Sequence, residues 1–201
     1  MNKSLILIII LFLLLFSLSR FTEHFSDKIT YCQAKDGNYY LVRDLKDKRR
    51  AANLLARVNR RIKRFIDYLR KRHYNNREVS RLFRNYNEHQ LTEAPKSSEN
   101  TSYSINKGEK IVFCLRHRHE DQDEHLTDIN TMMFVAIHEL AHLMSNSVGH
   151  TPEFWKNMSF LLQEAITCPN KIYQYVPYHE TPVKYCGIMI NDTPYKVELK
   201  K

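Results

Sequence analysis

The sequence predicts an α+β fold in which a small sheet packs on one apolar helix, preceded by a basic helical hairpin and an N-terminal hydrophobic helix. Three observations predict it. Within residues 43–72, apolar residues recur at alternating spacings of four and three, the period of a helix. Residues 110–116 are β-branched and aromatic, as is typical of a strand. Residues 129–145 form a strongly apolar run that is long enough for a buried helix.

Residues 1–20 are expected to target the chain to a membrane. Leu5 to Phe16 is an unbroken apolar run. As a helix, residues 4–19 would span about 24 Å at about 1.5 Å per residue, short of the hydrocarbon core of about 30 Å. An uncleaved signal anchor fits if Lys3 and Arg20 reach the two interfaces, and a cleaved signal peptide also fits the length. We expect a membrane-associated protein with a single N-terminal anchor, and secretion after cleavage is the alternative.

Residues 21–90 are expected to form a basic helical region. The whole chain holds 31 Lys and Arg against 22 Asp and Glu, a net charge of +9 that favours anionic partners. Thirteen of the basic residues fall in residues 43–72, against three Asp. The charge surrounds a single apolar stripe, which predicts one long amphipathic helix there and a shorter helix over residues 77–86. The stripe consists of Ala51, Leu55, Val58, Ile62, Phe65 and Leu69.

Residues 91–201 are expected to carry the chemistry of the protein. The polar stretch 88–104 is predicted to be a loop that leads into the strand. The acidic stretch 117–128 is predicted to be an exposed loop rather than a second metal site, although it contains His117, His119 and His125. A further helix is predicted to run to about Thr167, with Thr151 as its N-cap. Short strands and turns should follow, with a turn beside a buried Cys186.

Residues 138–142 read HELAH, which matches the metal-binding pattern His-Glu-x-x-His. On a helix, positions i and i+4 share one face, so the imidazoles of His138 and His142 can reach one metal ion. Glu139 points away from that face but stays close enough to take a proton from a zinc-activated water. Because ionisable residues are rarely left unpaired in so apolar a run, the pattern favours a zinc site over two ordinary histidines.

A catalytic zinc site needs a third protein ligand and one open position. His150 is the leading candidate, because Gly149 permits a sharp reversal that brings the chain back beneath the helix. Glu164, 22 residues beyond His142, is the alternative ligand. The more ordinary interpretation of Glu164 is a solvated helix residue. We therefore expect zinc to be held by His138, His142 and His150.

A second motif, GHTPEFW at residues 149–155, follows HELAH. Together the two motifs resemble the SprT-like and WLM-domain zinc metallopeptidases, the group that includes the DNA–protein crosslink proteases, over about residues 101–167. The resemblance implies a zincin-like core, with His138, His142 and His150 as zinc ligands and Glu139 as general base. It also implies that the strand containing Ile111 to Leu115 is the sheet edge along which an extended substrate lies. The hydrophobic N-terminus is similar to that of membrane-anchored metalloproteases of large DNA viruses.

The expected function is zinc-dependent hydrolysis of peptide bonds in a protein or peptide substrate, with Glu139 as general base. One alternative is a catalytically silent, membrane-associated adaptor that binds anionic lipid or nucleic acid through residues 43–72. The presence of Glu139 disfavours it, because a structural zinc site needs no base. The other alternative is a zinc hydrolase that acts on a non-peptide substrate.

The four cysteines form no CxxC pair, so a four-thiolate zinc site has no local support. More basic residues follow the hydrophobic segment than precede it, which places the following domain on the cytosolic side if the anchor is retained. That placement would leave the thiols reduced and would set the basic helix against acidic headgroups, so anionic lipid is favoured over DNA as its partner. The alternative is a solvated face of the helix that only aids solubility. An even number of cysteines also permits disulfides if the chain is exported, so their disulfide state stays open. The cysteines are Cys32, Cys114, Cys168 and Cys186.

Overall fold

A computed structural model describes residues 8–16, 28–117 and 125–195 of the chain. Residues 8–16 are helical, and the rest of the predicted anchor lies outside the described residues. Within the described part of the chain, no helix combines the length and apolar character needed to cross a membrane. The anchor over residues 1–20 therefore stays a prediction.

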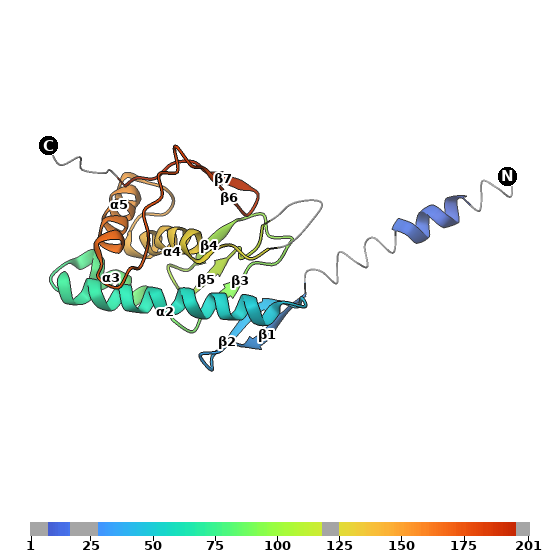
Figure 1. The fold of residues 1–201 in the computed structure, drawn as a ribbon, viewed down its shortest axis with the longest axis horizontal. Helices are drawn as coiled ribbons and strands as arrows, with labels where there is room; N and C mark the ends of the chain where they lie inside the picture. Colours follow the sequence, from blue (N-terminus) through green and yellow to red (C-terminus); the bar gives the residue numbers. More distant parts are fainter. Residues whose placement is uncertain (1–7, 17–27, 118–124, 196–201) are drawn as a thin grey trace.

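A five-stranded mixed sheet and the helices packed on it make the fold α+β, as predicted (Figure 1). Its strand order is β1-β2-β3-β5-β4. The two central pairings, β2 with β3 and β3 with β5, are parallel, and the two outer pairings are antiparallel. The strands are β1 (Ile29–Gln33), β2 (Tyr39–Arg43), β3 (Leu91–Glu93), β4 (Ser102–Ile105) and β5 (Lys110–Phe113).

Helix α2 (Lys48–Arg72) is the long amphipathic helix that the periodicity predicts, and it runs lengthwise along one side of the molecule (Figure 1). All six residues of the predicted apolar stripe are fully buried, and the helix packs on β2 and α4. The predicted start at Arg43 is wrong. Arg43 ends β2, where its backbone N–H donates to the buried carboxylate of Glu93 over 2.8 Å, so the chain at this point belongs to the sheet.

Helix α3 (Arg77–Asn85) packs against α2 and completes the predicted helical hairpin. The side chain of Asn76 caps its first turn by accepting from the backbone N–H of Val79. The region predicted as helical, residues 21–90, also contains β1 and β2, so the prediction of a purely helical region is wrong there. Because β2 pairs with β3, the sheet crosses the predicted division at residue 90.

The predicted loop over residues 88–104 contains two strands, and this prediction is wrong at β3 and β4. β3 has three residues and β4 has four, too few to display an alternating pattern. The side chains of β3 are all buried, whereas those of β4 are half-buried or exposed. Only pairing with neighbouring strands distinguishes such short segments from loops.

Helices α4 (Ile129–Met144) and α5 (Pro152–Thr167) confirm the two helices predicted for this part of the chain. Asp128 caps α4 by accepting from the backbone N–H groups of Asn130 and Thr131. Thr151 caps α5 as predicted, because its hydroxyl accepts from the backbone N–H of Phe154 over 3.3 Å. The two helices pack against each other, with α4 buried between α2, α3 and α5.

The chain ends in a hairpin of β6 (Val183–Tyr185) and β7 (Ile188–Ile190), whose turn contains the predicted buried Cys186. Cys186 forms a disulfide with Cys114, which directly follows β5. The cysteine count left disulfides open, and reduced thiols were expected only with a retained anchor and a cytosolic domain. This pair is oxidised, since the sheet and the hairpin bring the two Cα atoms to 6.0 Å, within the range that a disulfide requires. Cys32 and Cys168 are free.

Candidate metal centre

Helix α4 presents two of the predicted ligands on one face. The Nε2 atoms of His138 and His142, one helical turn apart, lie 3.2 Å from each other. The helix itself is held by burial, since most of its side chains belong to the core. Its rigid backbone therefore sets the spacing of the two imidazoles.

His150 joins them from the segment between α4 and α5. Its Nε2 atom lies 3.0 Å from that of His138, and the candidate ligand atoms of the three histidines all lie within 4.8 Å of one another. Among the described residues this is the single group of three or more ligand-type side chains that is compact enough for a metal ion. Gly149 has a φ of +81°, a left-handed conformation that favours glycine, and supplies the predicted reversal before His150.

The segment that carries His150 is held in shape by Glu153 of α5. One carboxylate oxygen of Glu153 accepts from the backbone N–H of Asn146 and the other from that of Ser147, both over 2.9 Å. The Ser147 hydroxyl also donates to Glu153, over 2.8 Å. Hydrogen bonds to the backbone N–H groups are the main cause that lowers the pKa of Glu153 to about 2. The Glu153 carboxylate is therefore ionised near pH 7 and can accept these hydrogen bonds there.

Basic and amide side chains from other elements hold the C-terminal end of α4. The Lys107 ammonium, in the turn between β4 and β5, donates to the carbonyls of Ser145, Asn146 and Ser147. The Arg81 guanidinium of α3 donates to the Met144 carbonyl over 2.6 Å. Positive charge is favourable at the C-terminus of a helix. These contacts fix the end of α4 from which the chain turns toward His150.

Phe154 lies directly beneath the histidines. Its ring is fully buried, and the centroids of the three imidazoles lie 4.3–4.8 Å from its centroid. In the sequence Phe154 stands out only as part of the GHTPEFW motif, and no pattern there defines a role for Glu153 or Lys107. The place of Glu153 in the first turn of α5 gave a weak signal, whereas no spacing in the sequence connects Lys107 to residues 145–147.

Burial sets the protonation states in the centre. Desolvation is the largest cause that lowers the pKa of His138 to about 3 and that of His142 to about 4, followed by the proximity of the other imidazoles. Both rings are therefore neutral near pH 7, which is the form that binds a metal. Desolvation raises the pKa of Glu139 to about 8, and its Oε2 atom is buried without a hydrogen-bond partner among the described residues.

These residues fit a zinc ion. Zinc accepts imidazole nitrogens as ligands, and a hydrolytic site uses three protein ligands with one position open. Here three close imidazole nitrogens face a cleft of about 750 Å³, which gives access from solvent. The Glu139 carboxyl, whose buried Oε2 atom has no hydrogen-bond partner among the described residues, lines the same cleft. A buried polar atom without a partner requires an explanation, and a bound metal with its water would provide one.

The opposite wall of the cleft is formed by β4, and this corrects the predicted sheet edge. Residues 100–104, 106 and 107 line the cleft together with the three histidines. β5, which contains most of Ile111 to Leu115, lies between β3 and β4 and so has no free edge. β4 is the outer strand on this side. The resemblance implied that β5 is the edge strand, but β5 is the strand next to the edge. The error arose because β4 was predicted to be a loop.

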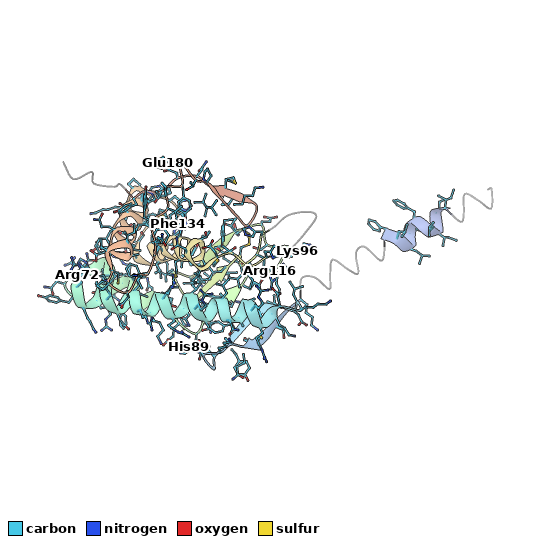
Figure 2. The ribbon with its side chains drawn as sticks, viewed as in Figure 1. Arg72, His89, Lys96, Arg116, Phe134 and Glu180 are labelled. Carbon is cyan, nitrogen blue, oxygen red and sulfur yellow. A yellow bond between two sulfur atoms is a disulfide. The ribbon has the colours of Figure 1, made fainter. Side chains whose placement is uncertain are left out.

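Glu164, the alternative third ligand, faces away from the histidines. Its carboxylate pairs with His73 over 3.1 Å and with Arg72 over 3.3 Å, at the C-terminal end of α2 where Figure 2 labels Arg72. In the predicted acidic loop, His117 and His125 are joined by a backbone hydrogen bond at the base of the loop. His119 lies outside the described residues, so this loop prediction stays untested.

Comparison with known proteins gives the following matches. The model of the WLM domain family matches residues 34–181. Uncharacterized protein R325 of Acanthamoeba polyphaga mimivirus is 32% identical over 191 residues, which are 92% of this chain and 93% of that protein. Uncharacterized protein 136R of Invertebrate iridescent virus 6 is 35% identical over 75 residues, 37% of this chain and 38% of that protein. Among solved structures, the crystal structure of Wss1 from Saccharomyces cerevisiae matches with a TM-score of 0.44 and 21% identity, covering 61% of this chain and 83% of the crystallised chain.

Proposed function

The chain belongs to the WLM domain family, and from this premise we propose that it is a zinc-dependent metallopeptidase. The observation that carries the proposal is the convergence of His138, His142 and His150 beside the buried Glu139 carboxyl. Three imidazoles in a solvent-open cleft suit a catalytic metal better than a structural one, which is normally closed by a fourth protein ligand.

A bound zinc ion would supply Lewis-acid chemistry, activating water and polarising a carbonyl. The residues of the chain would transfer the proton and hold the ligands in position. Glu139, directly after the first histidine, would accept the proton of the attacking water and pass it to the leaving amine. The pKa of about 8 describes this carboxyl without a metal, and a nearby cation favours its ionised form. Phe154 would keep the three imidazoles in place from below.

The cleft favours an extended peptide as substrate. β4 pairs with β5 along one edge, and its other edge is the end of the sheet. Its residues line the cleft opposite the histidines. An extended peptide can add to such an edge through main-chain hydrogen bonds. A peptide bound in this way would run past the metal centre, which brings a backbone carbonyl within reach of it.

Metal content and one substitution test the proposal. We expect one zinc per chain in purified protein that lacks residues 1–20, a deletion that removes no residue of the described core. Glu139→Gln should keep zinc and the melting temperature but lower peptide hydrolysis by about 10²–10⁴-fold, because the amide cannot accept the proton. Activity of the Gln variant within a few fold of wild type would rule out Glu139 as base. Zinc binding by a wild-type chain that cleaves no denatured protein would instead favour the non-peptide hydrolase.

We also propose that α2 docks the domain onto an anionic membrane surface. Five basic residues, called the basic face here, lie on the side of α2 opposite its buried stripe at 3.6 residues per turn. All are exposed. Basic residues near an anionic membrane surface contribute about 1 kcal/mol each. The basic face consists of Arg50, Arg57, Arg60, Arg64 and Lys71.

Binding to two kinds of anionic surface tests this second proposal. The chain lacking residues 1–20 is offered anionic liposomes, neutral liposomes and duplex DNA at low and high salt. We expect salt-sensitive binding to the anionic liposomes alone. Binding to DNA without binding to liposomes would replace lipid by nucleic acid as partner. If neither surface binds at low salt, the basic face only keeps the protein soluble.

A further inference from the structure

The last described part of the chain, Val183–Tyr195, returns to the metal centre. We call it the C-terminal strap. It lies beyond residues 34–181, which match the family, so nothing in the family match assigns it a role. After β7 it passes back above α4 toward α5 (Figure 1). Its residues line two cavities beside the histidines. Ile188 lines the cleft along β4, and residues 192–194 line a second pocket.

The strap is held at both ends. At its start, Cys186 is joined to Cys114 by the disulfide, and the Tyr185 hydroxyl lies 2.6 Å from that of Ser102 on β4. At its end, the Pro194 carbonyl accepts from the Ser159 hydroxyl of α5 over 3.2 Å. These anchors join the strap to the edge strand on one side of the centre and to α5 on the other. The strap therefore has a fixed position over the site.

The second pocket has a volume of about 360 Å³, within the range of about 300–1,000 Å³ of ligand sites. α4 contributes Phe134, labelled in Figure 2, and His138, and α5 contributes Trp155 and Met158. The strap closes the pocket with Asp192, Thr193 and Pro194. Aromatic rings, a thioether and a proline ring dominate these walls, while Asp192 is exposed to solvent.

His138 connects the pocket to the metal centre, because the same residue lines the cleft along β4. We propose that this pocket binds a large apolar side chain of the peptide substrate, next to the bond that is cleaved, and that the strap determines this preference. The proposal rests on the peptidase function proposed above and adds to it a substrate class, namely peptides with a leucine-sized or larger apolar residue beside the cleavage site. Apolar walls and the shared imidazole are its two supports.

Trp155 allows the pocket to be tested without any cleavage, because it is the single tryptophan of the chain. The full chain in detergent micelles, loaded with zinc, is titrated with N-acetyl-leucinamide, N-acetyl-glycinamide and N-acetyl-lysinamide. Trp155 fluorescence is followed. We expect a saturable change with the leucine compound at a concentration about tenfold below that needed for the glycine compound, since only the former buries an apolar side chain.

Two variants test whether the strap contributes to binding: one that fills the pocket and one matched control. Thr193→Phe places a ring in the pocket and should weaken binding of N-acetyl-leucinamide about tenfold. Thr181→Phe makes the same change at an exposed position that lines neither cavity, and should bind like wild type. Zinc content and melting temperature of both variants show whether they fold. Neither readout uses hydrolysis, so a failure of the peptidase proposal remains distinguishable from a failure of this one.

Three results would overturn the inference. The first is no saturable response of wild type to N-acetyl-leucinamide. The second is equal or tighter binding of the lysine compound, which would make Asp192 and not the apolar walls the determinant. The third is unchanged binding in a folded Thr193→Phe variant. If the peptidase is active, cleavage of a mixed peptide library should show large apolar residues at one position beside the cut, and Thr193→Phe should shift that preference to smaller residues.

Discussion

The metal centre and the basic face of α2 represent two different ways of building a binding site. At the metal centre, three imidazoles from α4 and the following segment converge to within 4.8 Å. On the basic face, five cationic side chains are spread along a 25-residue helix and do not converge on one point. The first arrangement depends on packing at almost every step, through Phe154, Glu153 and Lys107. The second depends only on a helix with one buried side.

The difference teaches what each site can do. A convergent site can position a single ion and a proton acceptor, so each member should be indispensable. A distributed site can only sum weak attractions to an extended charged surface, so each member should matter little. Single substitutions should therefore have large and specific effects at the centre, and small and interchangeable effects on the basic face.

The largest effect is expected from removing a histidine. His150→Ala should lower zinc affinity by more than about a hundredfold, since loss of supporting groups alone typically costs about 10–100-fold. Glu164→Ala should leave zinc affinity unchanged, because its carboxylate pairs with His73 and Arg72. Competition with a chelator measures both. Retained zinc in His150→Ala together with loss in Glu164→Ala would reverse the assignment of the third ligand.

The second effect is a dependence of zinc affinity on pH. In the metal-free protein Glu139, with a pKa of about 8, is mostly protonated at pH 7, and a bound cation would favour its ionised form. Between about pH 7 and about pH 8, zinc binding should release up to about one proton, and zinc affinity should rise by up to about tenfold per pH unit. His138 and His142, with pKa values of about 3 and about 4, are already neutral there. Calorimetry in buffers of different ionisation enthalpy counts the proton, and Glu139→Gln should release none.

A smaller effect should follow from loosening the segment that carries His150. Glu153→Ala removes the acceptor for the backbone N–H groups of Asn146 and Ser147, and should weaken zinc binding about tenfold, as groups that orient ligands typically do. Glu180→Ala, at an exposed residue outside the centre, is the matched control. Equal zinc affinity in the two variants would mean that the other contacts, those of Lys107 and Phe154, are enough to keep His150 in place.

The smallest effects are expected on the basic face. Any single change among Arg57→Ser, Arg60→Ser and Arg64→Ser should weaken binding to anionic liposomes by about fivefold at most, which corresponds to about 1 kcal/mol. The three changes should add, and zinc content should not move. Co-sedimentation with liposomes at several salt concentrations measures the losses. One arginine with a much larger effect than the others would indicate a focused site and break the comparison.

Much of this molecule could be predicted because the signals are local. The burial of Leu55 and Phe65 follows from the period of α2. The start of α5 follows from Thr151 and Pro152, and the approach of His138 to His142 follows from helical geometry alone. Each of these statements needs only neighbours within a few positions along the chain.

The errors share one cause, which is that strand pairing joins residues far apart in the sequence. β4 has four residues and little burial, and only its hydrogen bonds to β5 make it a strand. With β4 predicted as a loop, the sheet edge that the family resemblance implied fell at β5, which is one strand inside the observed edge. Arg43 was predicted to be helical because no sequence pattern indicates the hydrogen bond from its backbone N–H to Glu93, which is fifty positions away.

By itself the sequence determined the α+β class, the helices and the motif that marks the candidate metal centre, because helical periodicity, caps and the i, i+4 spacing are local properties of the chain. The tertiary structure alone decided which strand borders the cleft, that Glu164 faces α2, and that Cys114 meets Cys186. It also decided that the strap closes a pocket against His138. These are contacts between segments that are distant in sequence, and the packing of the whole core selects them rather than any local preference.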